Sequence, residues 1–108
     1  MTDSKTKYIT DLYAPENQQQ QNARLHIAAQ DFSVHISPLE GRLLQTLIAL
    51  GNIKNCVEIG TLGGYSALWL AEALADNNGH LYTCEHDDKR LEMAHAALDS
   101  HENVTIVA

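Results

Sequence analysis

Two acidic residues and several glycines have the types and the spacing that binding of a nucleoside-containing ligand needs. Glu58, Gly60 and Gly64 belong to residues 57–66, whose pattern predicts the end of a strand, a glycine-rich turn and the start of a helix. Glycine lets the backbone bend sharply and lets a ligand approach closely, and the free amides at a helix start add hydrogen-bond donors. Glu85 ends the next expected strand, where an acid can accept hydrogen bonds from both hydroxyls of a ribose.

The glycine spacing distinguishes between two kinds of cofactor. A dinucleotide-binding turn requires Gly-x-Gly-x-x-Gly, but position 62, between Gly60 and Gly63, is Leu. This departure disfavours an NAD-type Rossmann half, which stays a weaker alternative. The pattern acid-x-Gly-x-x-x-Gly, formed by Glu58, Gly60 and Gly64, instead resembles the first motif of class I S-adenosylmethionine-dependent methyltransferases.

Three segments in the same order make the resemblance more specific. They are Ile-Ser-Pro-x-x-Gly-x-Leu-Leu at 36–44, Val-Glu-Ile-Gly-Thr-x-x-Gly-Tyr-Ser-Ala at 57–67, and Cys-Glu-His-Asp at 84–87. Together they resemble the cation-dependent O-methyltransferases, a family that includes the caffeoyl-coenzyme A and catechol enzymes and many bacterial members. The resemblance covers nearly the whole chain. It implies an α/β, Rossmann-like class I methyltransferase fold, of which this chain would form the N-terminal half.

The resemblance also implies a set of cofactor-binding residues. The position of Ile36 lines the methionine end of the cofactor, and those of Glu85 and His86 contact the ribose hydroxyls and the adenine. The amino acid part of the cofactor is surrounded by the turn and the two elements beside it, namely Glu58, Gly60, Thr61, Gly64 and Ser66. For Glu58, a second interpretation stays open, in which it is a buried acid bonded to backbone N–H groups.

By the same resemblance, the full-length enzyme would use S-adenosylmethionine to methylate a hydroxyl of a small phenolic, catechol-like or nucleoside acceptor. A divalent cation such as Mg²⁺ would hold and acidify that hydroxyl. The family's metal ligands and catalytic base follow the third strand, so we expect no catalytic residue and no metal ligand in this chain. We therefore expect an N-terminal part of a longer enzyme. The alternative is a catalytically inactive, truncated cofactor-binding module.

The element pattern predicts one partial domain in two regions: a helical region at 1–52 and a βαβαβ cofactor-binding half at 53–108. We expect residues 1–10 to be frayed and Gln18 to Gln21 to form a solvated helix face. A capping box of Ser37 and Glu40 starts one helix, which Gly51 and Asn52 end. The expected elements are helices at 15–30, 39–50, 65–76 and from Asp87 or Asp88 to 100, a short extended segment at 32–36, and strands at 53–60, 80–85 and 103–107. The first strand should be buried on both faces, and Trp69 should pack in the core.

Composition excludes several classes of function. Seven Lys and Arg against fourteen Asp and Glu give a formal net charge of −7, which argues against binding of nucleic acid by bulk charge, although a tRNA acceptor stays open for a full-length enzyme. No apolar run approaches the about 20 residues of a membrane span, and residues 1–11 do not resemble a signal peptide.

Cys56 and Cys84 suit reduced, buried thiols on neighbouring strands of a cytoplasmic protein. The six histidines lack metal-ligand spacing. An apolar sheet edge left open by missing strands predicts self-association, and we expect a homodimer.

Overall fold

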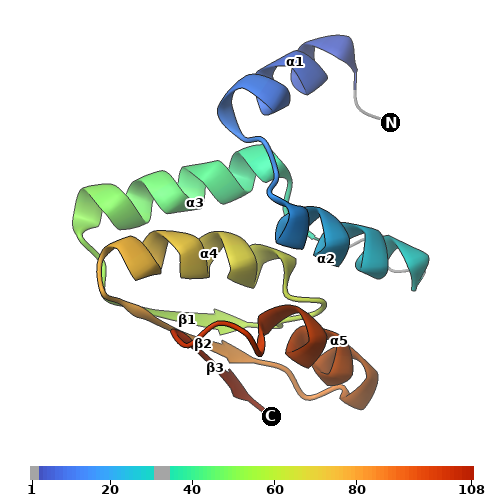
Figure 1. The fold of residues 1–108 in the computed structure, drawn as a ribbon, viewed down its shortest axis with the longest axis vertical. Coiled ribbons are helices and arrows are strands. Elements are labelled where there is room, and N and C mark those ends of the chain that lie inside the picture. Colours follow the sequence, from blue (N-terminus) through green and yellow to red (C-terminus); the bar gives the residue numbers. More distant parts are fainter. Residues whose placement is uncertain (1–2, 31–34) are drawn as a thin grey trace.

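The computed structural model describes residues 3–30 and 35–108 as three helices followed by three strands that alternate with two further helices (Figure 1). In chain order the elements are α1 (Ser4–Tyr13), α2 (Gln18–Ala29), α3 (Pro38–Gly51), β1 (Asn55–Ile59), α4 (Tyr65–Asp76), β2 (His80–Cys84), α5 (Asp88–Leu98) and β3 (Val104–Val107). The βαβαβ pattern expected from the sequence is therefore present. Its division at residue 52 into two regions stays a prediction.

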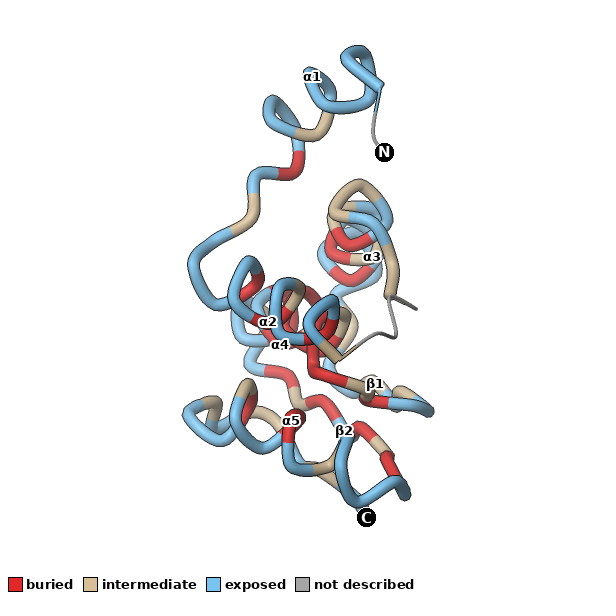
Figure 2. The backbone as a smooth tube through the Cα atoms, turned by 90° about the vertical axis from the view of Figure 1, so that its right-hand side faces the viewer, coloured by how far each residue is buried: buried red, intermediate tan, exposed pale blue. Residues whose placement is uncertain are grey.

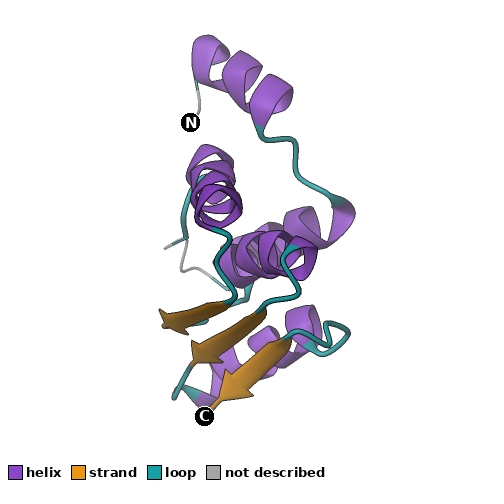
Figure 3. Cartoon of the chain, turned by 90° about the vertical axis from the view of Figure 1, so that its left-hand side faces the viewer, coloured by secondary structure: helices purple, strands orange, loops and turns teal. Residues whose placement is uncertain are grey.

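The three strands form one parallel sheet in the order β1-β2-β3. The strand arrows in Figure 3 point the same way, with the helices gathered on one side of them. The register places Val57 opposite Tyr82 and places Tyr82 opposite Thr105. Because all three strands run in parallel, the loops that follow β1 and β2 meet at one edge of the sheet, which is where ligands bind in open α/β sheets.

Helix α4 is the centre of the core. Its residues Leu68, Trp69 and Leu74 are all at most 3% exposed, and the helix packs between α3 and the sheet. Gly41 makes the close approach of α3 possible, because a Cβ at this position would lie 2.5 to 2.8 Å from atoms of the Trp69 indole. Figure 2 shows buried segments in α3, in α5 and along the strands, whereas nearly all of α1 is exposed. The prediction that Trp69 packs in the core is confirmed.

The N-terminal region differs from the sequence prediction. Residues expected to be frayed form α1, because the Asp3 carboxylate accepts a hydrogen bond from the Thr6 amide and caps the helix. Helix α2 begins at Gln18 instead of Pro15, since Asn17 and Gln20 form a reciprocal capping box. Gln20 is only 1% exposed, so the glutamine run is not entirely a solvated face.

The other helix boundaries agree well with the predictions. Ser37 and Glu40 form the expected capping box of α3, and Asn52 ends that helix in the left-handed conformation. Asp87 caps α5 by accepting from the Arg90 amide. Cys56 and Cys84 lie on the neighbouring strands β1 and β2 as free thiols. Of the extended segment expected at 32–36, residues 32–34 lie outside the described residues.

The prediction that β1 is buried on both faces is wrong for this chain. Val57 and Ile59 are 70% and 81% exposed, because α4 and α5 cover only the opposite face of the sheet. On this uncovered face, Tyr82 and Val107 are also exposed. Within residues 3–30 and 35–108, no strand pairs with the outer edge of β1. No helix of the described ranges has the length and the apolar character needed to cross a bilayer.

Candidate functional site

A cavity of about 560 Å³ lies at the carboxyl end of β1, where the glycine-rich turn leads into α4. Its size falls within the range of small-molecule and cofactor pockets. Five of the eight residues predicted from the sequence line it, namely Ile36, Glu58, Gly60, Thr61 and Ser66. The structure thus gathers residues from the segment before α3, the end of β1 and the start of α4 around one space.

Glu58 is the only carboxylate that β1 contributes to this cavity, and hydroxyl groups hold it in place. Ser66 donates a hydrogen bond to its Oε2, and the Thr83 hydroxyl donates to its Oε1 over 2.7 Å. Burial raises the pKa of Glu58, while the hydrogen bonds from Ser66 and Thr83 act in the opposite direction. The carboxylate therefore has hydroxyl donors rather than the backbone donors of the second sequence interpretation. It retains acceptor capacity for a cationic ligand group.

The turn between β1 and α4 is fixed by backbone hydrogen bonds to β2. The amides of Gly60 and Thr61 both donate to the Cys84 carbonyl, over 2.8 and 3.1 Å. Gly60 has φ +89°, a conformation that favours glycine, and a Cβ added there would meet open space. The Thr61 side chain is 1% exposed, and its hydroxyl lies 2.6 Å from that of Thr83. The amide, the carbonyl and the hydroxyl of Thr61 thus all have hydrogen-bond partners within the protein.

Gly64 lies at the start of α4, beside the cavity rather than in its wall. It is the N-cap of α4 with φ +86°, and a Cβ there would lie 3.0 Å from Ala97 of α5. It does not line the cavity. The glycine at this position allows α4 to turn and to pack closely on α5, and its role in cofactor binding stays a prediction.

Glu85 and His86 lie outside the lining of this cavity. Glu85, directly after β2, is a buried acid that is only 5% exposed. Its Oε1 accepts from the Leu62 amide over 2.8 Å, and its Oε2 accepts from the His86 and Asp87 amides over 3.2 Å. Glu85 therefore connects the glycine-rich turn to the loop after β2, and His86 is exposed beside it.

The sequence prediction missed several residues of the cavity wall. Ile27 of α2, His35 and Tyr65 line it, and Glu16 accepts a hydrogen bond from the Tyr65 hydroxyl over 2.7 Å. Tyr65 and Trp69 lie four residues apart on one face of α4, and their ring centroids are 6.4 Å apart. No local periodicity connects Glu16 or Ile27 with a turn more than thirty residues away, so only the tertiary structure reveals these contacts.

No group of three or more His, Cys, Asp or Glu side chains with the geometry of a metal site occurs among the described residues. Cys56 lies two residues before Glu58 and on the same face of β1. Burial, followed by the charge of Glu58, raises the pKa of its thiol. A raised pKa disfavours the thiolate, so Cys56 is unsuited to nucleophilic chemistry.

Comparison with known proteins gives consistent matches over this region. A family model described as O-methyltransferase matches residues 14–103. A catechol O-methyltransferase of Niastella koreensis is 38% identical over 98 residues, which are 90% of this chain and 44% of that protein.

Solved structures of O-methyltransferases show the same fold. The O-methyltransferase TomG from Streptomyces achromogenes, in complex with S-adenosylmethionine, has a TM-score of 0.88 at 30% identity, with 97% of this chain and 48% of that one covered. An O-methyltransferase from Bacillus cereus, in complex with S-adenosylhomocysteine, has a TM-score of 0.81 at 31% identity, with 93% and 47% covered. The chain thus spans about half the length of the relatives it matches.

Proposed function

Because the chain belongs to the O-methyltransferase family, we propose that its cavity binds S-adenosylmethionine and that the chain forms the cofactor-binding half of an enzyme that methylates a hydroxyl group. The observation that carries this proposal is the placement of Glu58. Its carboxylate lies in the cavity wall, held by two hydroxyl donors and without a cationic side chain bonded to it in the described part of the chain. Such a group suits the ammonium of the cofactor's methionine part.

The other residues have complementary tasks in this proposal. Ile36 gives the cavity an apolar wall beside the methionine end, and Gly60 lets the backbone approach the ligand without a side chain in between. Glu85 has lone pairs left beyond its three amide donors, which the ribose hydroxyls would use. His86 is exposed next to Glu85 and would pack against the adenine.

The bound cofactor would supply an electrophilic methyl group on its sulfonium. What this chain contributes is position: it orients the cofactor so that the methyl group faces an acceptor oxygen, and alignment of this kind accounts for much of the acceleration in transfer reactions. The acceptor that we propose is a small phenolic, catechol-like or nucleoside hydroxyl. The described residues offer no group of ligands for a divalent cation.

Titration calorimetry with S-adenosylhomocysteine tests the proposal on the chain as it is. We expect saturable binding, a marked loss of affinity in Glu85→Gln, and no change in Glu102→Gln, a matched control on the exposed surface near β3. NAD serves as the competing ligand. Binding of NAD in preference to S-adenosylhomocysteine, or equal affinity of Glu85→Gln and the parent chain, would contradict the proposal.

A catalytically inactive cofactor-binding module is the second candidate, and it agrees with the finding that the described residues include no group of side chains that could hold a metal ion. The two candidates differ in turnover. Methyl transfer to catechol, measured with Mg²⁺ and labelled S-adenosylmethionine, would be absent for the inactive module even where the cofactor binds. Measurable transfer would exclude that candidate, and it would also contradict the expectation that these residues alone do not suffice.

A further inference from the structure

We propose that Glu16 and Arg24 form a positioning pair that holds Tyr65, and with it the first turn of α4, in the geometry that the cofactor-binding turn requires. The inference rests on the proposed function for the ligand concerned. It assigns a role to two charged residues outside every motif of the sequence: Glu16 lies between α1 and α2, and Arg24 lies on α2.

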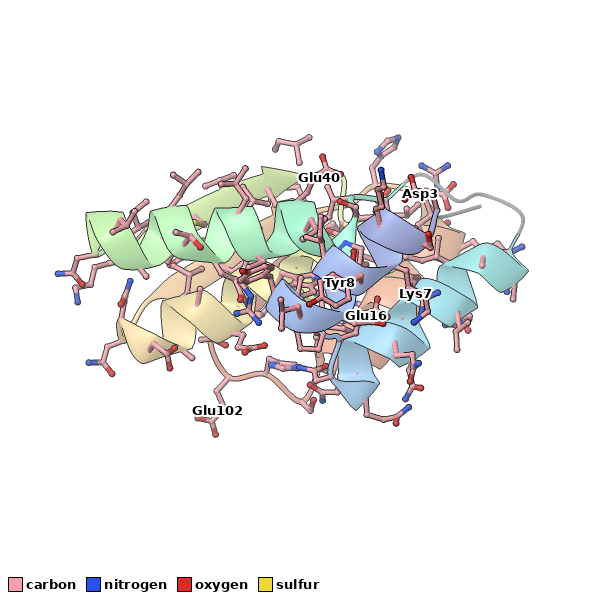
Figure 4. The ribbon with its side chains drawn as sticks, turned by 90° about the horizontal axis from the view of Figure 1, so that it is seen from above. Asp3, Lys7, Tyr8, Glu16, Glu40 and Glu102 are labelled. Atoms are coloured by element: carbon pink, nitrogen blue, oxygen red, sulfur yellow. The ribbon has the colours of Figure 1, made fainter. Side chains whose placement is uncertain are left out.

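The contacts of Glu16 are numerous and directional. The Arg24 Nε donates to both carboxylate oxygens of Glu16, over 2.8 and 3.1 Å, and its Nη2 donates to Oε1 over 2.9 Å. The Tyr65 hydroxyl donates to Oε2 over 2.7 Å. Side-chain exposure is 12% for Glu16 and 33% for Arg24. Figure 4 shows Glu16 well inside the outline of the molecule, whereas Glu102 points outward. A multiply bonded arginine–carboxylate pair of this kind fixes geometry as well as charge.

Tyr65 connects this pair to the site. It is the first residue of α4, is 1% exposed and lines the cavity. The next residue, Ser66, donates to Glu58. The ring of Tyr65 packs against His35, with centroids 5.0 Å apart, and against Trp69. Since two neighbouring rings pack against the Tyr65 side chain and Glu16 accepts from its hydroxyl, the first turn of α4 is restrained next to Ser66.

The electrostatics agree with an ionised Glu16. Burial alone would raise its pKa, but the hydrogen bonds from Arg24 and Tyr65, together with the positive charge of Arg24, hold the pKa below its usual value. Burial, followed by the hydrogen bond to Glu16, raises the pKa of Tyr65 and keeps its hydroxyl a donor. Both groups thus retain the protonation states that their hydrogen bond needs at neutral pH.

Helix α2 also contacts the turn at a second point. Ile27 is fully buried, and a Cβ added at Gly63 would lie 2.8 Å from its Cδ1. Arg24 and Ile27 lie three residues apart on α2. Arg24 bonds to Glu16, and Ile27 packs directly on the glycine-rich loop between β1 and α4. The position of α2 determines both contacts.

The test compares Glu16→Gln with Lys7→Met. The control removes an ion pair of the same type on α1, Lys7 with Asp11, whose side chains are 71% and 64% exposed. Hydrogen exchange of the amides at 61–66 is measured without ligand, and affinity for S-adenosylhomocysteine is measured by calorimetry. We expect faster exchange confined to 61–66 in Glu16→Gln and a loss of affinity of about tenfold or more. Lys7→Met should leave both unchanged.

Tyr65→Phe is the second variant, because it keeps the ion pair and removes only the hydroxyl. It should reproduce the exchange pattern of Glu16→Gln even where the latter folds poorly. The fluorescence of Trp69, the single tryptophan of the chain, should change on ligand binding in the parent and less in Tyr65→Phe. The fluorescence of Trp69 therefore reports on the packing of the neighbouring Tyr65 ring.

The outcomes separate this inference from the proposed function. Faster exchange at 61–66 in both variants, with no ligand binding by the parent chain, would uphold the positioning pair and overturn the proposed function. Unchanged exchange and affinity in a folded Tyr65→Phe would overturn the positioning pair. Exchange that rises uniformly along α4 would overturn it too, since it would reveal a general stability contribution.

Discussion

The Ser66 hydroxyl donates a hydrogen bond to the Glu58 carboxylate, which joins the first turn of α4 to the end of β1. The parallel register places Thr83 of β2 directly opposite Glu58, and its hydroxyl donates to the other carboxylate oxygen. Two neighbouring elements thus orient one acid at the wall of a cavity. Burial of this acid is costly for its charged form, which is the arrangement expected of a site that awaits a cationic ligand group.

Glu58→Gln should weaken binding of S-adenosylhomocysteine while it stabilises the folded chain at neutral pH. The pKa of Glu58 is raised in the folded state, mainly by burial. As pH rises from about 4 through the raised pKa, the unfolded chain releases this proton first, so the stability of the parent falls relative to the variant. The gain in melting temperature from Glu58→Gln should therefore be larger at about pH 8 than at about pH 4. Thermal melts of both proteins at the two pH values check this.

Glu102→Gln is the matched control for that experiment, since Glu102 is exposed and distant from the cavity lining. It should alter neither the affinity nor the pH dependence of the melting temperature. If Glu58→Gln raised the melting temperature equally at both pH values, burial of the charge would not be the cause. If its affinity equalled that of the parent, Glu58 would not bind the amino group of the ligand.

Ser66→Ala should destabilise the chain by about 1 to 2 kcal/mol, because a half-buried carboxylate loses one of its donors. Affinity for S-adenosylhomocysteine should fall as well, since Glu58 would no longer be held toward the cavity. Chemical denaturation and calorimetry measure the two effects. Ser100→Ala, at an exposed turn after α5, should change neither quantity. A loss of stability of the same size in Ser100→Ala would refute the specific role of the Ser66 hydroxyl.

Gly63→Ala should be more damaging than Gly60→Ala. At Gly63 the new methyl group would collide with Ile27, whereas at Gly60 it would meet open space and cost only the strain of a positive φ. We expect losses in unfolding free energy of about 2 to 3 kcal/mol for Gly63→Ala and about 1 kcal/mol for Gly60→Ala. Combination of Gly63→Ala with Ile27→Ala should cost less than the sum of the single changes, because the smaller side chain relieves the collision. Strict additivity in denaturation experiments would contradict the contact.

The sequence predicted the elements that local signals define. The Ser37 and Glu40 capping box, the glycine-rich turn and the helix cap of Asp87 all depend on residues a few positions apart, and the structure agrees with each. The resemblance to O-methyltransferases depended on such segments as well, and the family match confirms it. Five of the eight cofactor-binding residues predicted from these segments line one cavity in the structure.

The sequence predictions were wrong where contacts between residues far apart in the sequence determine the structure. Pro15 is a good helix start by type, but Asn17 caps α2 and leaves Glu16 to pair with Arg24 and Tyr65. The apolar pattern of β1 predicted burial on two faces, although burial depends on which elements pack against the strand. The apolar pattern of β1 indicates only that both faces of the strand are suited to burial.

The uncovered face of the sheet leads to the last prediction. Val57, Ile59, Tyr82 and Val107 expose apolar surface there, and the outer edge of β1 has no partner strand within the described ranges. Contiguous apolar surface beside a free strand edge favours association, so we expect the chain to form dimers or larger species as its concentration rises. Val57→Thr combined with Tyr82→Thr should shift sedimentation velocity profiles toward the monomer. Threonine favours strands as Val and Tyr do, but it exposes less apolar area. Leu25→Gln, which removes a side chain that is 54% exposed on α2, is the control and should leave the profile unchanged. A parent chain that stays monomeric throughout the concentration series would show that this face does not drive association.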